Sequence, residues 1–336
     1  MVCPDHRRAQ YPRRPENAAL SLKRETGCQP FAFIPPVREM STVFNTTKGI
    51  VMRNYLFILA VFGLSAGSPA GLSAVAWGQD GFFKTKVGEI DFYCVKDAAD
   101  EIDNAVFAGD PEVVAKMAPK GKTPLDYNTF LVAKGNTAVL IDTGNGGNLL
   151  DNLGKTGISP EKIDAVLLSH SHGDHVGGLL KNGERVFPKA VVWIAPKELV
   201  FWNKSHPDQV EACRKAYGAF KEIVPDEKTA ILLPEITAVD LEGHTPGHTG
   251  FMIASQDQKL LVIADLIHSE VIQLPHPEIC AKYDQDREKS AEIRRDTLRR
   301  AAVERIPVAG SHIPGTGIRN VAVQGDGFIR SGTTVQ

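Results

Sequence analysis

Metal-binding residue types are concentrated in one short run of the sequence. Six consecutive positions hold His170, His172, Asp174 and His175, and these include three of the chain's ten histidines. The run follows residues 164–168, whose apolar side chains predict a buried strand. Imidazoles at alternate positions of an extended turn can face one point, while the aspartate and the last histidine face a second point. Because nitrogen donors suit zinc, the run predicts a site for two divalent cations.

Three later segments each place a further candidate ligand near the end of a predicted strand. The segment GHTPGH, residues 243–248, contains a Pro-Gly turn that would present His248 on a rigid loop. Asp265 ends an apolar run, and a carboxylate there could bridge two metals about 3.5–4 Å apart. His312 follows another apolar run. His244 has two interpretations, a residue that orients a ligand or an ordinary turn histidine.

Taken in order, these motifs resemble those of the metallo-β-lactamase-fold hydrolases. The order is HxHxDH, GHTPGH, a strand-end aspartate and a strand-end histidine, and the resemblance extends over residues 86–331. The carboxyl-terminal part is most similar to the methyl parathion hydrolase branch, on the segments 264–268, 309–315 and 325–328. The resemblance implies a single α/β domain, a four-layer αββα sandwich with its site at one edge of the two sheets.

The resemblance also implies a ligand set and a reaction. The cofactors would be two divalent ions, expected to be Zn²⁺, sharing a hydroxide that attacks an ester-like bond. Asp174 is the expected catalytic residue, because it could take or relay the proton of the attacking water. The implied ligands are His170, His172 and His248 for the first metal, Asp174, His175 and His312 for the second, and Asp265 between the two.

The ligands specify a nucleophile and leave the substrate open. Phosphotriesters, aryl esters and lactones suit the methyl parathion hydrolase branch, whereas β-lactamase or thioesterase activity is the alternative on the same fold. An iron-based redox protein is a further alternative, although diiron relatives carry a glutamate where this chain has His172. For the substrate pocket, Trp202 and His268 are the candidates. Trp202 could instead pack in the core, and His268 could instead be a solvated loop residue.

Alternating strands and helices must position these residues. Lys134-Gly135-Asn136 between two apolar runs predicts a hairpin of strands 128–133 and 137–141. The longest predicted helix, 286–304, is amphipathic and rich in charge pairs at helical spacing. The other predicted strands are 88–95, 164–168, 190–194, 236–241, 250–254, 259–264, 306–309, 318–323 and 327–330, and the other predicted helices are 146–153, 196–202 and 208–223.

The amino-terminal quarter has a different character. Residues 1–51 are rich in arginine and proline and show no apolar period, which is typical of a disordered segment or an over-extended reading frame. Residues 52–76 combine a basic start, an apolar run and the triplet Ala-Val-Ala, the pattern of a secretory signal peptide. We therefore expect a periplasmic or secreted protein whose enzyme domain is 77–336, with no membrane span in its mature form.

Composition limits the partners. The chain is 43% hydrophobic with a net charge of −2, which favours a globular protein and gives no support to nucleic-acid binding. A small-molecule substrate is the expected partner, and a homodimer is the assembly that we consider. Of the five cysteines, Cys94, Cys213 and Cys280 lie in the predicted domain, either as buried thiols or as one disulfide and a free thiol.

Overall fold

The computed structural model describes residues 81–225 and 231–332, which fold around two facing β-sheets. The first sheet is antiparallel from β1 to β5 and parallel from β5 to β10. In spatial order it comprises β1 (Phe82–Val87), β2 (Ile90–Asp103), β4 (Lys122–Lys134), β5 (Thr137–Ile141), β6 (Ala165–Leu167), β9 (Val191–Ile194) and β10 (Lys221–Glu222). The second comprises β11 (Ile236–Asp240), β12 (Thr249–Ser255), β13 (Gln258–Ala264), β15 (Val308–Gly310) and β16 (Ile318–Arg319).

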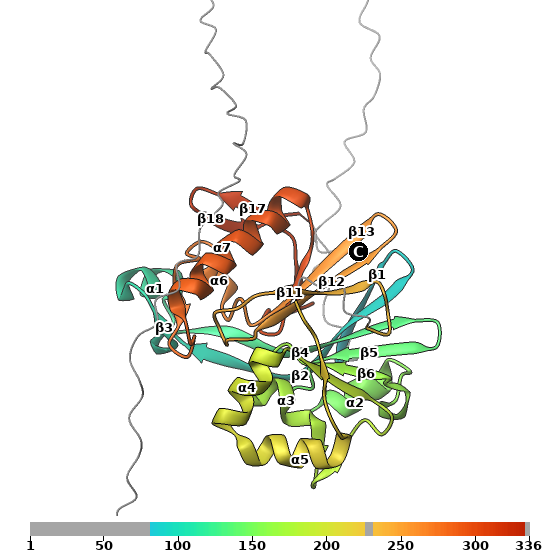
Figure 1. The fold of residues 1–336 in the computed structure, drawn as a ribbon. Coiled ribbons are helices and arrows are strands. Elements are labelled where there is room, and N and C mark those ends of the chain that lie inside the picture. Colours follow the sequence, from blue (N-terminus) through green and yellow to red (C-terminus); the bar gives the residue numbers. More distant parts are fainter. Residues whose placement is uncertain (1–80, 226–230, 333–336) are drawn as a thin grey trace, which may run out of the picture. The chain divides into compact units, whose positions relative to one another are not determined.

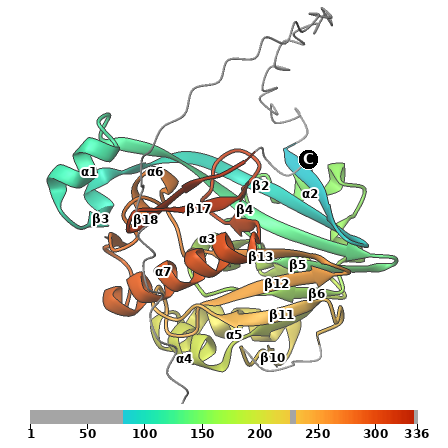
Figure 2. The same ribbon diagram turned by 90° about the horizontal axis from the view of Figure 1, so that it is seen from above.

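The helices cover the outer faces of the two sheets. They are α1 (Pro111–Met117), α2 (Leu149–Lys155), α3 (Gly173–Val176), α4 (Pro196–Ser205), α5 (Pro207–Tyr217), α6 (Glu270–Gln273) and α7 (Arg287–Glu304). Figures 1 and 2 show α7 over the sheet that contains β12 and β13, and α4 and α5 on the far side of the other sheet. Three short strand pairs lie outside the sheets: β3 (Phe107–Ala108) with β14 (Cys280–Ala281), β7 (Leu180–Lys181) with β8 (Glu184–Arg185), and β17 (Val321–Gln324) with β18 (Gly327–Arg330).

Alternation along the strands builds the core. Successive side chains of a strand point to opposite faces. Phe130 and Val262 therefore pack between the sheets, whereas Leu131 faces α2 and α4 and Ile263 faces α7. The two helical layers and two sheets confirm the predicted four-layer αββα sandwich.

A fourth apolar cluster lies under a long extension of the first sheet. Beyond Lys96, β2 and β4 continue as a paired arm that carries the short helix η1 (Asn104–Val106), β3 and α1. Ile102 and Leu125 of this arm pack with Val114 of α1 and Ile272 of α6. The arm matters for function because it forms one wall of the cavity described below.

Several predicted boundaries are wrong. The predicted strand 88–95 contains a turn at Gly88, where φ is +56° and the chain passes from β1 into β2. The predicted helix 208–223 ends at Tyr217, and Gly218 at φ +81° leads into β10. The hairpin turn at Gly135 is confirmed. Within the described part of the chain, all three cysteines are buried free thiols.

The predictions for residues 1–51 and 52–76 fall outside the described residues. Among the helices of the described segments, none is both long enough and apolar enough to cross a membrane.

Candidate metal centre

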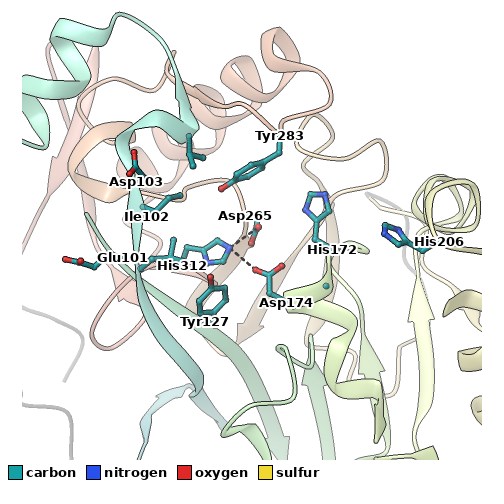
Figure 3. Close-up of a pocket in the computed structure, with 13 residues that line it drawn as sticks. Glu101, Ile102, Asp103, Tyr127, His172, Asp174, His206, Asp265, Tyr283 and His312 are labelled. Atoms are coloured by element: carbon teal, nitrogen blue, oxygen red, sulfur yellow. Dashed lines mark hydrogen bonds and ion pairs between the residues drawn. The ribbon is translucent and has the colours of Figure 1, made fainter. Parts of the chain in front are cut away.

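Four loops bring the candidate ligands to one edge of the sandwich. The loop after β6 carries His170 and His172 and leads into α3, whose first turn holds Asp174 and His175. The loop between β11 and β12 carries His244, Asp265 follows β13, and His312 follows β15. Figure 3 shows Asp174, Asp265 and His312 pointing toward one another. The first of these loops follows a strand of the first sheet, and the other three adjoin strands of the second sheet. The candidate ligands therefore come together only when the two sheets pack face to face.

The first donor group consists of three imidazole nitrogens and a carboxylate: His170, His172, His244 and Asp265. His172 Nδ1 lies 3.0 Å from both His170 Nε2 and His244 Nε2. His244 donates from Nδ1 to Asp284 at 2.7 Å, which leaves a lone pair on its Nε2. Three nitrogens of this kind at one point can be satisfied together by a cation that they all coordinate.

The second donor group consists of Asp174, His175, Asp265 and His312. His312 Nε2 lies 3.4 Å from Asp174 Oδ2 and 3.1 Å from Asp265 Oδ2. His175 Nε2 and Asp265 Oδ1 are buried 3.1 Å apart, yet neither makes a hydrogen bond. Buried polar atoms of this kind are normally paired, so the donor set fits a second metal ion with Asp265 shared between the two groups.

The protonation states of His172, Asp265 and Asp174 suit metal ligands. Burial and the neighbouring His244 lower the pKa of His172 to about 4, so its ring is neutral at neutral pH. Burial alone would raise the pKa of Asp265, but the facing His175 and His312 hold it well below the ordinary value for aspartate. Asp174 behaves in the same way, because His175 and His312 outweigh its burial and lower its pKa. Ionised carboxylates and neutral imidazoles are the forms that bind metals.

Backbone and side-chain partners fix the ligand rings. His175 Nδ1 lies 2.8 Å from Asp142, whose carboxylate also accepts from the backbone N–H of Ser169. His312 Nδ1 donates to the carbonyl of Asp126 at 3.0 Å. These contacts fix the tautomer and direction of each ring. The sequence does not single out Asp284, because it lies in a loop without a motif.

The prediction that His248 is a ligand is wrong. Its Nδ1 donates to the carbonyl of Leu241 at 3.0 Å, and its Nε2 accepts from the backbone N–H of Asp265 at 3.3 Å. Both ring nitrogens are therefore used to hold backbone, although the ring lies beside the donor groups, with its centroid 5.2 Å from that of His170 and 5.5 Å from that of His244. His244, the first histidine of the same segment, takes the place in the first donor group.

The two candidates for the substrate pocket do not line the cavity. Trp202 is fully buried in α4, stacks on Phe220 at 5.8 Å and donates to Gln209, so the core interpretation is correct. His268 lies beside the donor groups, with Nε2 3.3 Å from Asp265 Oδ2 and its ring stacked on His312. Its side chain is buried, and it is neither in the cavity lining nor solvated.

A cavity of about 590 Å³ opens over the centre (Figure 3). Asp174, Asp265 and His312 form part of its lining, and Tyr283 projects over them. Burial raises the pKa of Tyr127 and of Tyr283, so both phenols stay protonated and able to donate. The arm formed by β2 and β4 contributes an apolar wall. The full lining is Glu101, Ile102, Asp103, Val106, Leu125, Tyr127, His172, Gly173, Asp174, His206, Asp265, Tyr283 and His312, with no lysine or arginine among them.

Known proteins share this architecture. AidC, a dizinc quorum-quenching lactonase solved in complex with a product, is 28% identical; the match covers 76% of this chain and 98% of AidC, with a TM-score of 0.69. The hydrolase AbOPH of the β-lactamase superfamily is 25% identical over 76% of this chain and 98% of its own, with a TM-score of 0.68.

Sequence comparison gives shorter matches. A hydroxyacylglutathione hydrolase of Pectobacterium carotovorum is 31% identical over 129 residues, which is 38% of this chain. The match covers 42% of that relative, so the chain spans less than half of its length. The sequence model of the metallo-β-lactamase superfamily matches residues 123–310, more than half of the chain, and includes all six donor-group positions up to Asp265. Because this match covers more than half of the chain, and because the chain has the sandwich fold and the candidate donor groups, it belongs to the metallo-β-lactamase superfamily.

Proposed function

We propose that this protein is a dinuclear metal-dependent hydrolase that cleaves an ester-like bond in an uncharged, partly apolar substrate. The observation that carries the proposal is the pair of donor groups that share Asp265 at a cavity. Residues His170, His172 and His244 would hold one ion, and Asp174, His175 and His312 the other. Zinc suits these nitrogen and carboxylate donors, and the related AidC is a dizinc enzyme.

The proposed chemistry divides between the ions and the chain. When bound, the ion pair would lower the pKa of a water molecule to near neutrality and polarise the carbonyl or phosphoryl group. Asp174 reaches into the cavity as an ionised carboxylate and would accept a proton and pass it on (Figure 3). Tyr283, which stays protonated and projects over the centre, would donate a hydrogen bond to the substrate oxygen.

The cavity lining supports uncharged substrates. Glu101 and Asp103 lie on the arm side, and no lysine or arginine of the lining could pair with a carboxylate. β-Lactam drugs and glutathione thioesters carry carboxylates, so this lining disfavours both alternatives. Ile102, Val106 and Leu125 offer an apolar surface for an alkyl or aryl group. Lactones, aryl esters and phosphotriesters fit this description, in keeping with the methyl parathion hydrolase branch that the sequence motifs indicate.

Metal quantification combined with a substrate panel tests the proposal. We expect two metal ions per chain and turnover of a neutral lactone, an aryl ester or a phosphotriester. The kcat/KM for a β-lactam and for a glutathione thioester should be at least about tenfold lower. Turnover of only the anionic substrates would contradict the substrate class. Iron as the sole metal, with oxygen consumption, would favour the redox alternative.

A second experiment addresses Asp174. Asp174→Asn should lower kcat by about 10²–10⁴-fold if the carboxylate moves the proton. Metal content is measured on the same sample, because the residue is also a proposed ligand. Full activity at normal metal content would remove the proton-transfer role.

A further inference from the structure

A buried carboxylate without a cation lies behind the first donor group. Glu198 is in the first turn of α4, and 0% of it is exposed. Within residues 81–225 and 231–332, no cationic side chain forms an ion pair with it. Burying an unpaired carboxylate costs several kcal/mol unless hydrogen bonds replace the lost water. The hydrogen bonds of Glu198 therefore indicate what it does.

Its two oxygens serve two different loops. Oε1 accepts from the backbone N–H of Ser171 at 2.9 Å and from its hydroxyl at 2.6 Å. Oε2 accepts from the hydroxyl of Thr245 at 2.7 Å and from the backbone N–H of Gly247 at 3.0 Å. Ser171 stands between His170 and His172 in the sequence, and Thr245 follows His244.

The contact therefore joins the two sheets at the donor group. The Ser171 loop follows β6 of the first sheet, and the Thr245 loop precedes β12 of the second. Close approach requires glycine at 247, because a Cβ there would lie 2.3 Å from the backbone nitrogen of Glu198. The four hydrogen bonds of Glu198 act as a clamp between the two loops. His172 Nδ1 of one loop and His244 Nε2 of the other lie 3.0 Å apart.

We infer that Glu198 is a positioning residue that holds the two loops at the spacing the first metal ion requires. The inference rests on the proposed function, since it assigns Glu198 to one of the two proposed metal sites. The second donor group is held by other partners, Asp142 and the carbonyl of Asp126. Loss of Glu198 should therefore weaken one metal and spare the other.

Glu198→Gln tests the inference with a side chain of the same size. Its amide oxygen can keep the Ser171 contacts, but its NH₂ group would face the N–H of Gly247, where two donors cannot pair. We expect the affinity for one zinc ion, measured by stepwise chelator competition, to fall about 10–100-fold. The affinity for the other ion should stay within about twofold of the wild-type value. His244→Ala identifies which step belongs to the first donor group.

Glu270→Gln is the matched control. Glu270 is also a buried glutamate, but it pairs with Arg319 and Arg330 away from the donor groups. Its replacement should lower the melting temperature and leave both zinc affinities unchanged. If Glu198→Gln does not fold, Thr245→Val removes one hydrogen bond of the same clamp and should weaken the same zinc step.

The outcomes separate this inference from the proposed function. Wild-type protein that binds no zinc would overturn the proposed function and the inference with it. Two tight zinc ions in the wild type and in both Glu198→Gln and Thr245→Val would overturn only the role of Glu198. Equal weakening of both ions in Glu198→Gln would also overturn it, because the change would then be general rather than local.

Discussion

Two histidines four positions apart, His244 and His248, have opposite tasks at the metal centre. His244 turns one nitrogen to Asp284 and the other to the first donor group. His248 uses both ring nitrogens in hydrogen bonds to the backbone of Leu241 and Asp265. Both are histidines of the same short segment, GHTPGH, so the sequence alone cannot tell which of them is the ligand. The direction of each ring depends on hydrogen-bond partners that lie up to 40 positions away.

This assignment yields a paired prediction. His244→Ala should reduce the metal content from two ions per chain to about one and lower kcat/KM at least about 100-fold. His248→Gln should keep two ions and lose activity more mildly, because its ring holds the backbone of Asp265 rather than a metal. Both are checked by elemental analysis and steady-state kinetics. The reverse pattern, with metal lost only in the His248 variant, would restore the original assignment.

At the scale of elements, strands with regular alternation are predicted well. The pair β12–β13, and β5 with the second half of β4, alternate between the inner and outer faces and lie where the sequence places them; the first half of β4, from Lys122, was not predicted. The outer half of β2, from Lys96 to Asp103, was missed because acidic residues interrupt its alternation. It is a strand because it pairs with β4, a tertiary cause that periodicity does not contain. The sequence therefore did not predict the cavity wall to which this half of β2 contributes, nor the substrate preference that we propose from it.

The arm makes a prediction about substrate length. Val106→Ala removes part of the apolar wall of the cavity and should lower kcat/KM for an ester with a long acyl chain about fivefold, a loss of about 1 kcal/mol. The value for the corresponding acetyl ester should change less than about twofold. Val113→Ala, which packs in the same apolar cluster from α1 outside the cavity lining, is the control. Equal losses for both esters would show that the wall does not contact the acyl chain.

A second element-scale prediction concerns α7. Arg294 is fully buried and donates to the carbonyls of Leu266, Pro277 and Ile279, which ties the helix to the loops beside the metal centre. Arg294→Met removes these hydrogen bonds and the cation beside the buried Asp284 carboxylate, and it should lower the free energy of unfolding by about 3–5 kcal/mol. Denaturant unfolding measures the loss. As a control, Arg299→Lys, at an exposed position of the same helix, should change the free energy of unfolding by less than about 0.5 kcal/mol.

At the scale of the whole molecule, the amino-terminal pattern predicts processing. Export with cleavage after the Ala-Val-Ala triplet would give a mature chain that begins near Trp77. Amino-terminal sequencing of protein purified from its native host checks this expectation. Recovery of any residue from 1–51 would contradict both the signal peptide and the interpretation of residues 1–51 as an over-extended reading frame.

The concentration of buried histidines predicts how the metal-free protein responds to acid. Burial lowers the pKa of His172 and His268 to about 4 and of His248 to about 3, and it holds His170 well below its ordinary value. The unfolded chain protonates all four near pH 6.5, so below that pH the unfolded state binds more protons and stability falls.

Two other histidines oppose this trend. Burial disfavours the charged forms of His175 and His312, but the Asp265 carboxylate outweighs it and raises both pKa values. Their contribution is present below pH 6.5 and is lost as the pH rises through the raised values. Four lowered groups against two raised ones should leave a net decrease of at least about 2 kcal/mol in the free energy of unfolding between pH 6.5 and pH 4. Denaturant unfolding of chelator-treated protein measures it, and His268→Gln should flatten the curve because it removes one of the four. A free energy of unfolding that stays constant or increases on acidification would mean that the native protein accepts these protons, which would contradict the lowered pKa values of His170 and His172 in the first donor group.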